Sequence, residues 1–314
     1  MTDLSLPNNL DIAIVVPCYN EEAAITGVVE DFRKALPSAA IYVYDNNSTD
    51  NTVAAAREAG AIVRNEPLQG KGNVVRRMFA DVDADIYVMV DGDNTYDASA
   101  APAMIKKLLD DNLDMLNGKR VHEGTDAYRP GHRFGNTLLT SLVAIIFGKR
   151  FDDMLSGYKI FSHRFVKSFP SLSSGFEIET ELTVHALELR MPVAEVETSY
   201  GARPEGSESK LSTFADGYRI LKMIALLIKE ERPLQFFSAL FGVFALSSII
   251  LSIPVVTTYL ETGLVPRIPT AVLVTGMMLL GFLSFACGLI LDTVTRGRQE
   301  LKRLQYLGVK RPRN

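Results

Sequence analysis

The chain has little of what several classes of protein depend on. Its 314 residues include two cysteines, four histidines and no tryptophan. Cys18 and Cys287 stand far apart and match no metal-binding spacing, which argues against a disulfide framework and fits a reducing compartment. The histidines form no zinc or catalytic-triad pattern either. Basic residues do not exceed acidic ones, with 33 Lys and Arg against 37 Asp and Glu, so no nucleic-acid partner is expected.

Apolar residues, by contrast, are concentrated near the C-terminus. Residues 236–260 and 268–291 carry no charge, and each stretch exceeds the roughly 20 residues that a bilayer core requires. A short connection over 261–267 joins them, so we predict an antiparallel transmembrane hairpin over 233–295. The alternative is a helical hairpin buried in the core of a soluble protein.

Positive charge flanks both ends of this predicted hairpin. Lys229 and Arg232 precede it, and a basic tail over 296–314 follows it. Because basic residues favour the cytoplasmic side of a membrane, both ends are predicted to be cytoplasmic. The sequence therefore predicts an integral protein of the cell inner membrane, with its N-terminal domain and both termini in the cytoplasm.

Residues 214–232, just before the hairpin, have the pattern of an amphipathic helix. Apolar residues recur at steps of three and four, and basic residues share another face: Phe214, Tyr218, Leu221, Ala225 and Ile228 against Arg219, Lys222 and Lys229. A helix of this kind suits the headgroup layer of a membrane, so we predict an interfacial helix. The alternative is an ordinary amphipathic helix that packs on a sheet.

Residues 1–213 alternate between short β-rich runs and stretches with helical periodicity. The β-rich runs fall at 12–16, 40–45, 61–66 and 85–91. This alternation predicts a parallel α/β sheet. In such sheets ligands bind beyond the carboxyl ends of the strands. Polar clusters stand at these places, at 19–21, 45–50 and 91–93.

Asp91, Gly92 and Asp93 form a compact acidic turn after the last of these runs. A small residue between two carboxylates lets both reach one cation. Oxygen ligands suit Mg²⁺ or Mn²⁺, which bridge to substrate phosphates. Asp and Gly are also common in turns that bind no metal. The turn alone therefore leaves both interpretations open.

The context of this turn carries a family resemblance. PCYNEE at 17–22, DNNSTDNT at 45–52, GKG at 70–72 and the acidic turn resemble, in order and spacing, glycosyltransferase family 2. Four motifs downstream resemble its polyprenyl-phosphate glycosyltransferases, the group that includes dolichol-phosphate mannose synthase: 118–120, 156–161, 176–179 and 207–212. The resemblance covers roughly residues 10 to 230. It implies a Rossmann-like GT-A domain that binds nucleotide sugar, followed by the interfacial helix and the hairpin.

The resemblance also assigns residues to the sugar donor. It implies that the nucleoside pocket is lined by Pro17, Tyr19, Glu21 and Asp45. Lys71 would approach the pyrophosphate, with glycines on either side that remove side-chain obstruction. Asp91 and Asp93 would hold Mg²⁺ or Mn²⁺, which offsets charge on the departing diphosphate, and Asp93 is the first predicted catalytic residue. The alternatives are turn and helix capping for Asp45 and Asp50, and an exposed, solvated lysine for Lys71.

Two positions depart from the pattern of the relatives. Thr95 stands where relatives carry a Gln that can coordinate the metal, so the third protein ligand is in doubt. Asn46 stands where many relatives carry an acid, which leaves the choice of nucleobase open. We favour UDP over GDP.

The acceptor requires cations, because a lipid phosphate must approach a donor that is already anionic. The resemblance implies that this phosphate is bound by Arg120, Arg133, Thr137, Arg203, Ser209 and Lys210. Asp153 is the second predicted catalytic residue, placed to orient the acceptor or a cationic neighbour. Asp152 could fill that role instead.

The sequence thus predicts a metal-dependent, inverting glycosyltransferase. It would move one sugar from a nucleotide diphosphate sugar to undecaprenyl or dolichyl phosphate at the cytoplasmic membrane face, for cell-envelope glycan or glycoprotein modification. A homo-oligomer is left open. One alternative is a processive polysaccharide synthase, but the chain has no Trp for the Q-x-x-R-W element of such enzymes. Another is a non-catalytic membrane scaffold that recruits a flippase.

Overall fold

The computed structural model of the chain describes most of its residues. These are residue 7 and 10–122, 140–141, 143–144, 148, 150–171, 173–175, 177–204, 222 and 225–310. By its internal contacts the chain divides into two compact units, one made of residues 1–220 with 302–314 and the other of residues 221–301.

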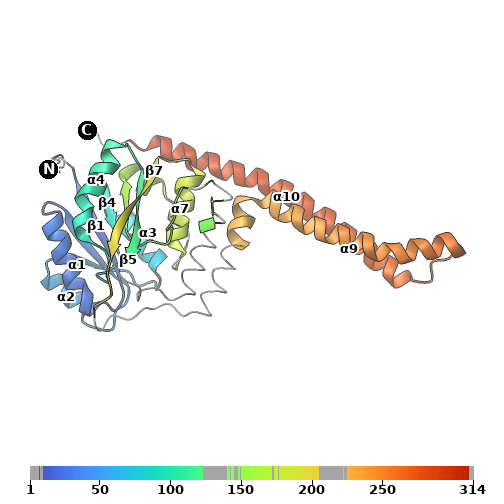
Figure 1. Cartoon of the computed structure of the whole chain (residues 1–314), viewed down its shortest axis with the longest axis horizontal. Helices are drawn as coiled ribbons and strands as arrows, with labels where there is room; N and C mark the ends of the chain where they lie inside the picture. Colours follow the sequence, from blue (N-terminus) through green and yellow to red (C-terminus); the bar gives the residue numbers. More distant parts are fainter. Residues whose placement is uncertain are drawn as a thin grey trace. The chain divides into compact units, whose positions relative to one another are not determined.

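The first unit is built on a sheet of seven described strands (Figure 1), in the order β3-β2-β1-β4-β6-β5-β7. The strands are β1 Ile12–Cys18, β2 Ala40–Asp45, β3 Ile62–Asn65, β4 Ile86–Met89, β5 Met115–His122, β6 Lys159–Ser162 and β7 Val193–Tyr200. Strand β6 is antiparallel to both of its neighbours, and every other pairing is parallel. The carboxyl ends of six strands and the start of β6 therefore share one edge.

Helices cover both faces of this sheet. They are α1 Glu22–Ala35, α2 Thr52–Glu58, α3 Lys71–Asp81, α4 Ala101–Asp110, α6 His163–Ser168 and α7 Ile178–Glu188, with a 3₁₀ turn at Ala98–Ala100. Helix α1 packs with α2 and α4, whereas α3 packs with α7. Every residue of β1 is buried, as expected for a central strand covered on both sides.

The predicted α/β alternation is confirmed. The four runs proposed from sequence are strands β1 to β4, parallel to one another and separated by α1, α2 and α3. No strand after residue 91 was predicted from the sequence. The structure adds β5, β6 and β7, and β6 is the strand that breaks the parallel pattern.

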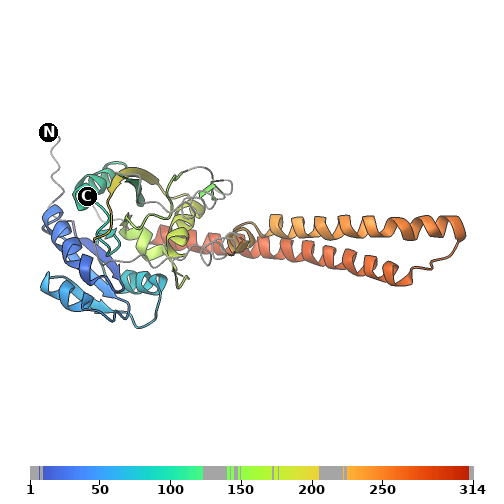
Figure 2. The same ribbon diagram turned by 60° about the horizontal axis from the view of Figure 1, so that its bottom comes forward.

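The second unit contains helix α9 Pro233–Thr262 and most of helix α10, which spans Ile268–Gly308. Figure 2 shows the two helices running side by side, joined by the short connection after Thr262. Gly263 ends α9 in a left-handed conformation with a φ of 70°. Both helices are long and apolar enough to cross a membrane, and almost none of their apolar stretches is buried. This exposure suits lipid-facing helices and is unlike a core hairpin of a soluble protein.

Specific contacts hold α9 and α10 together. Ser248 on α9 donates a hydrogen bond of 2.9 Å to the Val274 carbonyl on α10. The ring of Phe241 lies 5.3 Å from that of Phe282. Gly288 leaves room for Phe237, which a Cβ at that position would contact closely. Small residues at such crossings are typical of helix packing in membranes.

The segments that flank the predicted hairpin are partly described. Residues 225–231 of the predicted interfacial helix are helical, and residues 214–221, 223 and 224 lie outside the described residues. The predicted basic tail starts as helix, because α10 continues to Gly308.

Candidate active site

Polar groups gather along the edge of the sheet where the parallel strands end. The order of the strands places them in sequence across this edge. The Asp45 end of β2 comes first, residues 19–21 follow β1, and the acidic turn follows β4. The segment 151–158 then leads into β6, and Arg120 lies in β5. The sheet thus brings together residues that are more than 100 positions apart.

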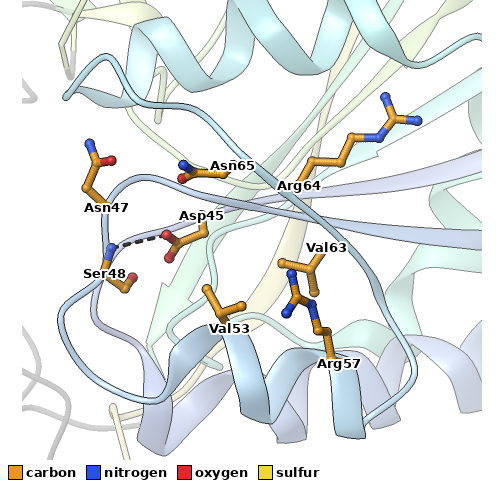
Figure 3. Close-up of a pocket in the computed structure, with 8 residues that line it drawn as sticks. All are labelled: Asp45, Asn47, Ser48, Val53, Arg57, Val63, Arg64 and Asn65. Carbon is orange, nitrogen blue, oxygen red and sulfur yellow. Dashed lines mark hydrogen bonds between the residues drawn. The ribbon is translucent and has the colours of Figure 1, made fainter.

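A cavity of about 450 Å³ opens at one end of this row (Figure 3). It is lined by Asp45, Asn47, Ser48, Val53, Arg57, Val63, Arg64 and Asn65. One carboxylate oxygen of Asp45 accepts a hydrogen bond of 3.1 Å from the Ser48 amide. The other, Oδ1, is buried and has no hydrogen-bond partner in the described part of the chain. Buried polar atoms are rarely left unpaired, so this oxygen suits a donor group of a ligand.

Of the four residues predicted to line the nucleoside pocket, only Asp45 lines this cavity. Tyr19 is 36% exposed and follows Cys18, the residue of β1 that is paired with Asp45. Pro17 lies within β1. Glu21 is buried, and its amide donates to Thr52 at 2.8 Å. Its carboxylate is close enough to Asp93 to help raise the pKa of that group. Glu21 therefore lies nearer to the acidic turn than its predicted role suggested.

Asn46 binds the loop over residues 66–70. Its amide nitrogen donates 2.8 Å hydrogen bonds to the carbonyls of Glu66 and Leu68, and its oxygen accepts from the Gly70 amide at 2.7 Å. An acid at this position could not donate the first two bonds. The departure noted in the sequence thus has a structural reason, because Asn46 fixes the loop that leads to Lys71.

The GKG motif packs against the segment 173–175. Gly70 has a φ of 125°, and a Cβ at Gly70 or Gly72 would collide with the backbone carbonyls of Ser174 or Ser173. The amide of Gly72 donates to the carbonyl of Ser174 at 3.1 Å. Close approach of two backbones, which requires glycine, is therefore what the structure shows for this motif.

Lys71 lies between two carboxylates, with only 11% of its side chain exposed. Its ammonium group lies 2.6 Å from Asp91 and also contacts Glu179. Burial alone would lower the pKa of Lys71, but the two carboxylates outweigh it and hold the pKa well above its ordinary value. The alternative of an exposed, solvated lysine is therefore wrong. The charge of Lys71 is directed at the acidic turn.

Asp93 in the acidic turn has two partners. One oxygen accepts from the Thr95 hydroxyl at 2.6 Å, and the other lies 2.7 Å from the guanidinium of Arg203. Burial and the nearby Asp91 carboxylate raise the pKa of Asp93, against the opposing effects of Thr95 and Arg203. Thr95, which replaces the Gln of relatives, orients Asp93.

The residues of the turn fit a divalent cation whose coordination shell is completed by the substrate. No three His, Cys, Asp or Glu side chains converge on one point within the described residues, so an all-protein metal site is absent there. Asp91 and Asp93 are nevertheless near neighbours whose charges interact, and each is balanced by a cation, Lys71 or Arg203. Two carboxylates plus substrate phosphates form a ligand set that Mg²⁺ and Mn²⁺ use.

Arg120 and Asp153 form a bidentate pair beyond the acidic turn. The Nε and Nη2 atoms of Arg120 each lie 2.7 Å from an oxygen of Asp153. The guanidinium also lies over the ring of Tyr200, 5.6 Å from its centre. Asp152, the alternative to Asp153, is more exposed and lies 3.5 Å from Lys119. Of the two acids, Asp153 is therefore the one that holds a cationic neighbour by a bidentate contact.

The remaining predicted acceptor residues are only partly visible. Arg203 pairs with Asp93 of the acidic turn. It follows β7, which is next to β5, the strand that carries Arg120. Arg133, Thr137, Ser209 and Lys210 lie outside the described residues.

The structure adds residues to which no role was assigned from the sequence. Glu179 is the second acid of the FEIE stretch and holds Lys71. Tyr96 accepts a hydrogen bond from the Gly157 amide at 2.8 Å, which holds the segment before β6 beside the acidic turn. Lys159 is fully buried in the SGYKIF stretch. The only sequence signal for Glu179 and Lys159 was their place in motifs quoted for the resemblance.

Comparison with known proteins gives a family match and several relatives. The family described as Glycosyl transferase family 2 matches residues 13–167. Glycosyltransferase AglJ of Haloferax volcanii is 30% identical over 309 residues, which cover 96% of this chain and all of the relative. A dolichyl-phosphate hexose transferase of the same organism is 29% identical, over 71% of this chain and 96% of the relative.

Among solved structures, the fold is similar to that of glucosyl-3-phosphoglycerate synthase from Mycobacterium tuberculosis. One such structure contains Mn²⁺, UDP and glucosyl-3-phosphoglycerate. The match has a TM-score of 0.58 at 23% identity and covers 70% of this chain and 80% of that one. At this identity the likeness concerns the fold.

Proposed function

This chain belongs to glycosyltransferase family 2, and we propose that it transfers one sugar from a nucleotide diphosphate sugar to polyprenyl phosphate, with inversion. Its sheet domain has the GT-A-like fold expected from the sequence. The observation that carries the proposal is the order of groups along the sheet edge. The Asp45 cavity, the acidic turn and the Arg120–Asp153 pair follow one another in the order that nucleoside, diphosphate and acceptor phosphate require.

The donor would bind with its nucleoside in the Asp45 cavity. The unpaired Oδ1 of Asp45 would accept a hydrogen bond from the base or the ribose. UDP is our preferred nucleotide, and the UDP in glucosyl-3-phosphoglycerate synthase supports this choice. Lys71 and Arg203, which balance the acidic turn, would lie next to the diphosphate.

A divalent cation held by Asp91 and Asp93 would supply positive charge where the nucleoside diphosphate departs. The Mn²⁺ in glucosyl-3-phosphoglycerate synthase supports Mg²⁺ or Mn²⁺ as this ion. The chain's own residues orient the site. Thr95 fixes the carboxylate of Asp93, and Lys71 fixes that of Asp91.

The acceptor would be a lipid phosphate received by Arg120 and Arg203. The similarity to a protein named dolichyl-phosphate hexose transferase supports this class of acceptor. A phosphomonoester has its second pKa near ~6 and is largely dianionic at neutral pH, so it needs no strong general base. Catalysis would then depend on alignment and on charge stabilisation.

The helices α9 and α10 would anchor the enzyme in the membrane that carries its acceptor. Their exposed apolar side chains support a lipid-facing hairpin. The basic residues on both sides of the hairpin support a cytoplasmic location for the catalytic unit and both termini, at the inner membrane.

The test is direct transfer. The detergent-solubilised full chain is incubated with undecaprenyl phosphate, Mg²⁺ or Mn²⁺, and a panel of labelled UDP- and GDP-sugars, and the label that enters the organic phase is measured. We expect one sugar to be transferred and Asp93→Asn to abolish transfer while the protein stays folded. Absence of lipid-linked label with every donor would overturn the proposal and favour the scaffold alternative. Long polymeric products would favour a processive synthase.

A further inference from the structure

Lys159, the first residue of β6, is a charged side chain in the interior of the sheet domain. It is fully buried. Its ammonium group donates hydrogen bonds to the Asn117 side-chain oxygen at 2.6 Å and to the Met154 carbonyl at 3.1 Å. A buried lysine is costly to maintain unless its charge has a use, because an apolar residue of similar length would pack at lower cost.

The sheet register explains which groups surround Lys159. Asn117 of β5 lies directly opposite Lys159 of β6, and Glu195 of β7 lies directly opposite Asn117. Residues paired across neighbouring strands point to the same face, so these three side chains form one row. Asn117 completes the row by donating a 2.8 Å hydrogen bond to Glu195.

This row holds the segment that carries Asp153. Asn117 donates to the Asp153 carbonyl at 2.8 Å. Glu195 accepts from the amides of Asp152 and Asp153 at 2.8 Å and 3.1 Å. Together with the bond from Lys159 to the Met154 carbonyl, these contacts fix the backbone of three consecutive residues, 152–154.

The same segment also contacts two groups of the proposed active site, Arg120 and Asp91. The carboxylate of Asp153 grips Arg120 by two bonds of 2.7 Å. At the other end of the segment, a Cβ on Gly157 would collide with the Asp91 carboxylate. The segment therefore spans the distance between the acidic turn and Arg120.

We propose that Lys159 is a positioning residue for the acceptor. Acting through Asn117, Glu195 and the Met154 carbonyl, it fixes Asp153 and hence the guanidinium of Arg120 where the acceptor phosphate is received. The inference rests on the proposed function, since it concerns the acceptor end of that same site. Lys159 does not touch the substrate itself, and it acts through the two hydrogen bonds that its charged ammonium group donates.

The charge of Lys159 gives the inference a pH signature. Burial lowers the pKa of Lys159 to about 8, against the opposing charges of Asp153, Glu179 and Glu195, while Arg120 lowers it further. Above pH 8 the side chain would therefore lose its charge, which weakens the two hydrogen bonds that it donates. Use of the acceptor should decline in this range, whereas Lys159→Arg, which stays charged, should not show this decline.

The experiment compares KM for polyprenyl phosphate with KM for the nucleotide sugar in the full chain. Lys159→Met should raise the acceptor KM by roughly 10- to 100-fold, as expected for a misplaced binding group, with the donor KM changed less than about twofold. Lys167→Met is the matched control. Lys167 also donates to backbone carbonyls, those of Phe79 and Val82, but on the side of α6 away from the site. It should lower stability and leave both KM values unchanged.

Glu195→Gln provides a second variant that preserves size. It weakens the hold on Asp152 and Asp153 without removing a buried lysine, so a folding failure of Lys159→Met does not end the test. It should raise the acceptor KM in the same way. Equal losses for donor and acceptor, or unchanged acceptor KM in both folded variants, would overturn the inference.

Hydrogen exchange of residues 151–157, measured without substrates, separates this inference from the proposed function. Lys159→Met and Glu195→Gln should speed exchange there, and Lys167→Met should not. If the wild type fails to transfer sugar to polyprenyl phosphate but this exchange pattern holds, the acceptor assignment is wrong and the positioning row stands. Unchanged exchange in an enzyme that does transfer sugar would mean that the row does not position the segment.

Discussion

At the scale of single residues, two carboxylates in one motif have different surroundings. Both carboxylate oxygens of Asp50 accept hydrogen bonds within the protein, from the amides of Thr52 and Glu22 at 3.0 Å and 3.2 Å. This is the turn role that the sequence had left as an alternative, since the N-cap of α2 is Asn51. Asp45, which lines the cavity, makes one such bond through Oδ2, but its Oδ1 is buried and has no hydrogen-bond partner among the described residues. Residue type alone does not separate a structural acid from a binding acid, whereas the partners of each oxygen do.

This difference predicts opposite effects for the same substitution. Asp45→Asn should weaken nucleotide-sugar binding by about 1.5–3 kcal/mol, the usual value of a hydrogen bond to a charged group, with little change in stability. Asp50→Asn should leave donor affinity unchanged and lower stability by about 1 kcal/mol, because an NH2 group replaces one of the two oxygens that accept from Thr52 and Glu22. Calorimetric titration with UDP and thermal unfolding measure the two effects. Equal donor affinity in both variants would show that the cavity does not bind the nucleoside.

At the scale of elements, α7 carries a histidine that is buried without charge. His185 contacts the rings of Phe165 and Phe169, and burial, followed by the charge of Lys302, lowers its pKa to about 3 from an ordinary 6.5. Between these two values the unfolded chain binds a proton that the folded chain does not. This contribution to stability is therefore complete above pH 6.5 and is lost as the pH falls below it.

The expected result is a steep loss of stability in mild acid. Each pH unit below 6.5 should lower the free energy of unfolding by up to about 1.4 kcal/mol through His185. His185→Leu removes the titrating group and should flatten the dependence between pH 6.5 and 5. Circular dichroism can follow unfolding, since the chain lacks tryptophan for fluorescence. A dependence that is equally steep in the variant would assign the effect to other groups.

The elements also show what the sequence could predict. Strands β1 to β4 were predictable because each is a short apolar run followed by a helical period. Strand β7 mixes half-buried and exposed positions, and β6 has only four residues, so neither gives a clear pattern. In the site, the acidic turn was visible as a local motif. The pairing of Lys71 with Glu179 and of Asn117 with Lys159 was not, because each joins residues that meet only through the sheet.

At the scale of the whole molecule, the C-terminal end of the chain belongs to the catalytic unit. Tyr306 donates a 2.6 Å hydrogen bond to the fully buried Asp114, which is also paired with Arg164 at 2.8 Å. Lys302 lies 2.7 Å from Glu188, whose side chain is fully buried. These contacts join residues 302–306 to elements that precede the membrane helices in sequence. Residues 296–314 are predicted from the sequence to be a basic cytoplasmic tail, and we propose that residues 302–310 of this tail complete the catalytic domain.

This proposal predicts how the catalytic unit can be separated from the membrane helices. A chain cut after Arg232 loses Lys302 and Tyr306, which leaves Glu188 and Asp114 without those partners. Breaking a buried ion pair costs about 3–5 kcal/mol, so the cut chain should unfold at much lower temperature or fail to fold.

The matched comparison is a chain that keeps the C-terminal residues. Replacing residues 222–301 by a flexible linker of about 20 residues keeps both contacts, and such a linker spans roughly 25 Å on average. That variant should be soluble without detergent, bind UDP and retain the stability of the full catalytic unit. Adding Tyr306→Phe to it should remove about 1.5–3 kcal/mol, the usual value of one hydrogen bond to a charged group, while Arg164 still pairs with Asp114. Equal thermal stability of the cut and linked chains would show that the C-terminal residues do not contribute to the domain.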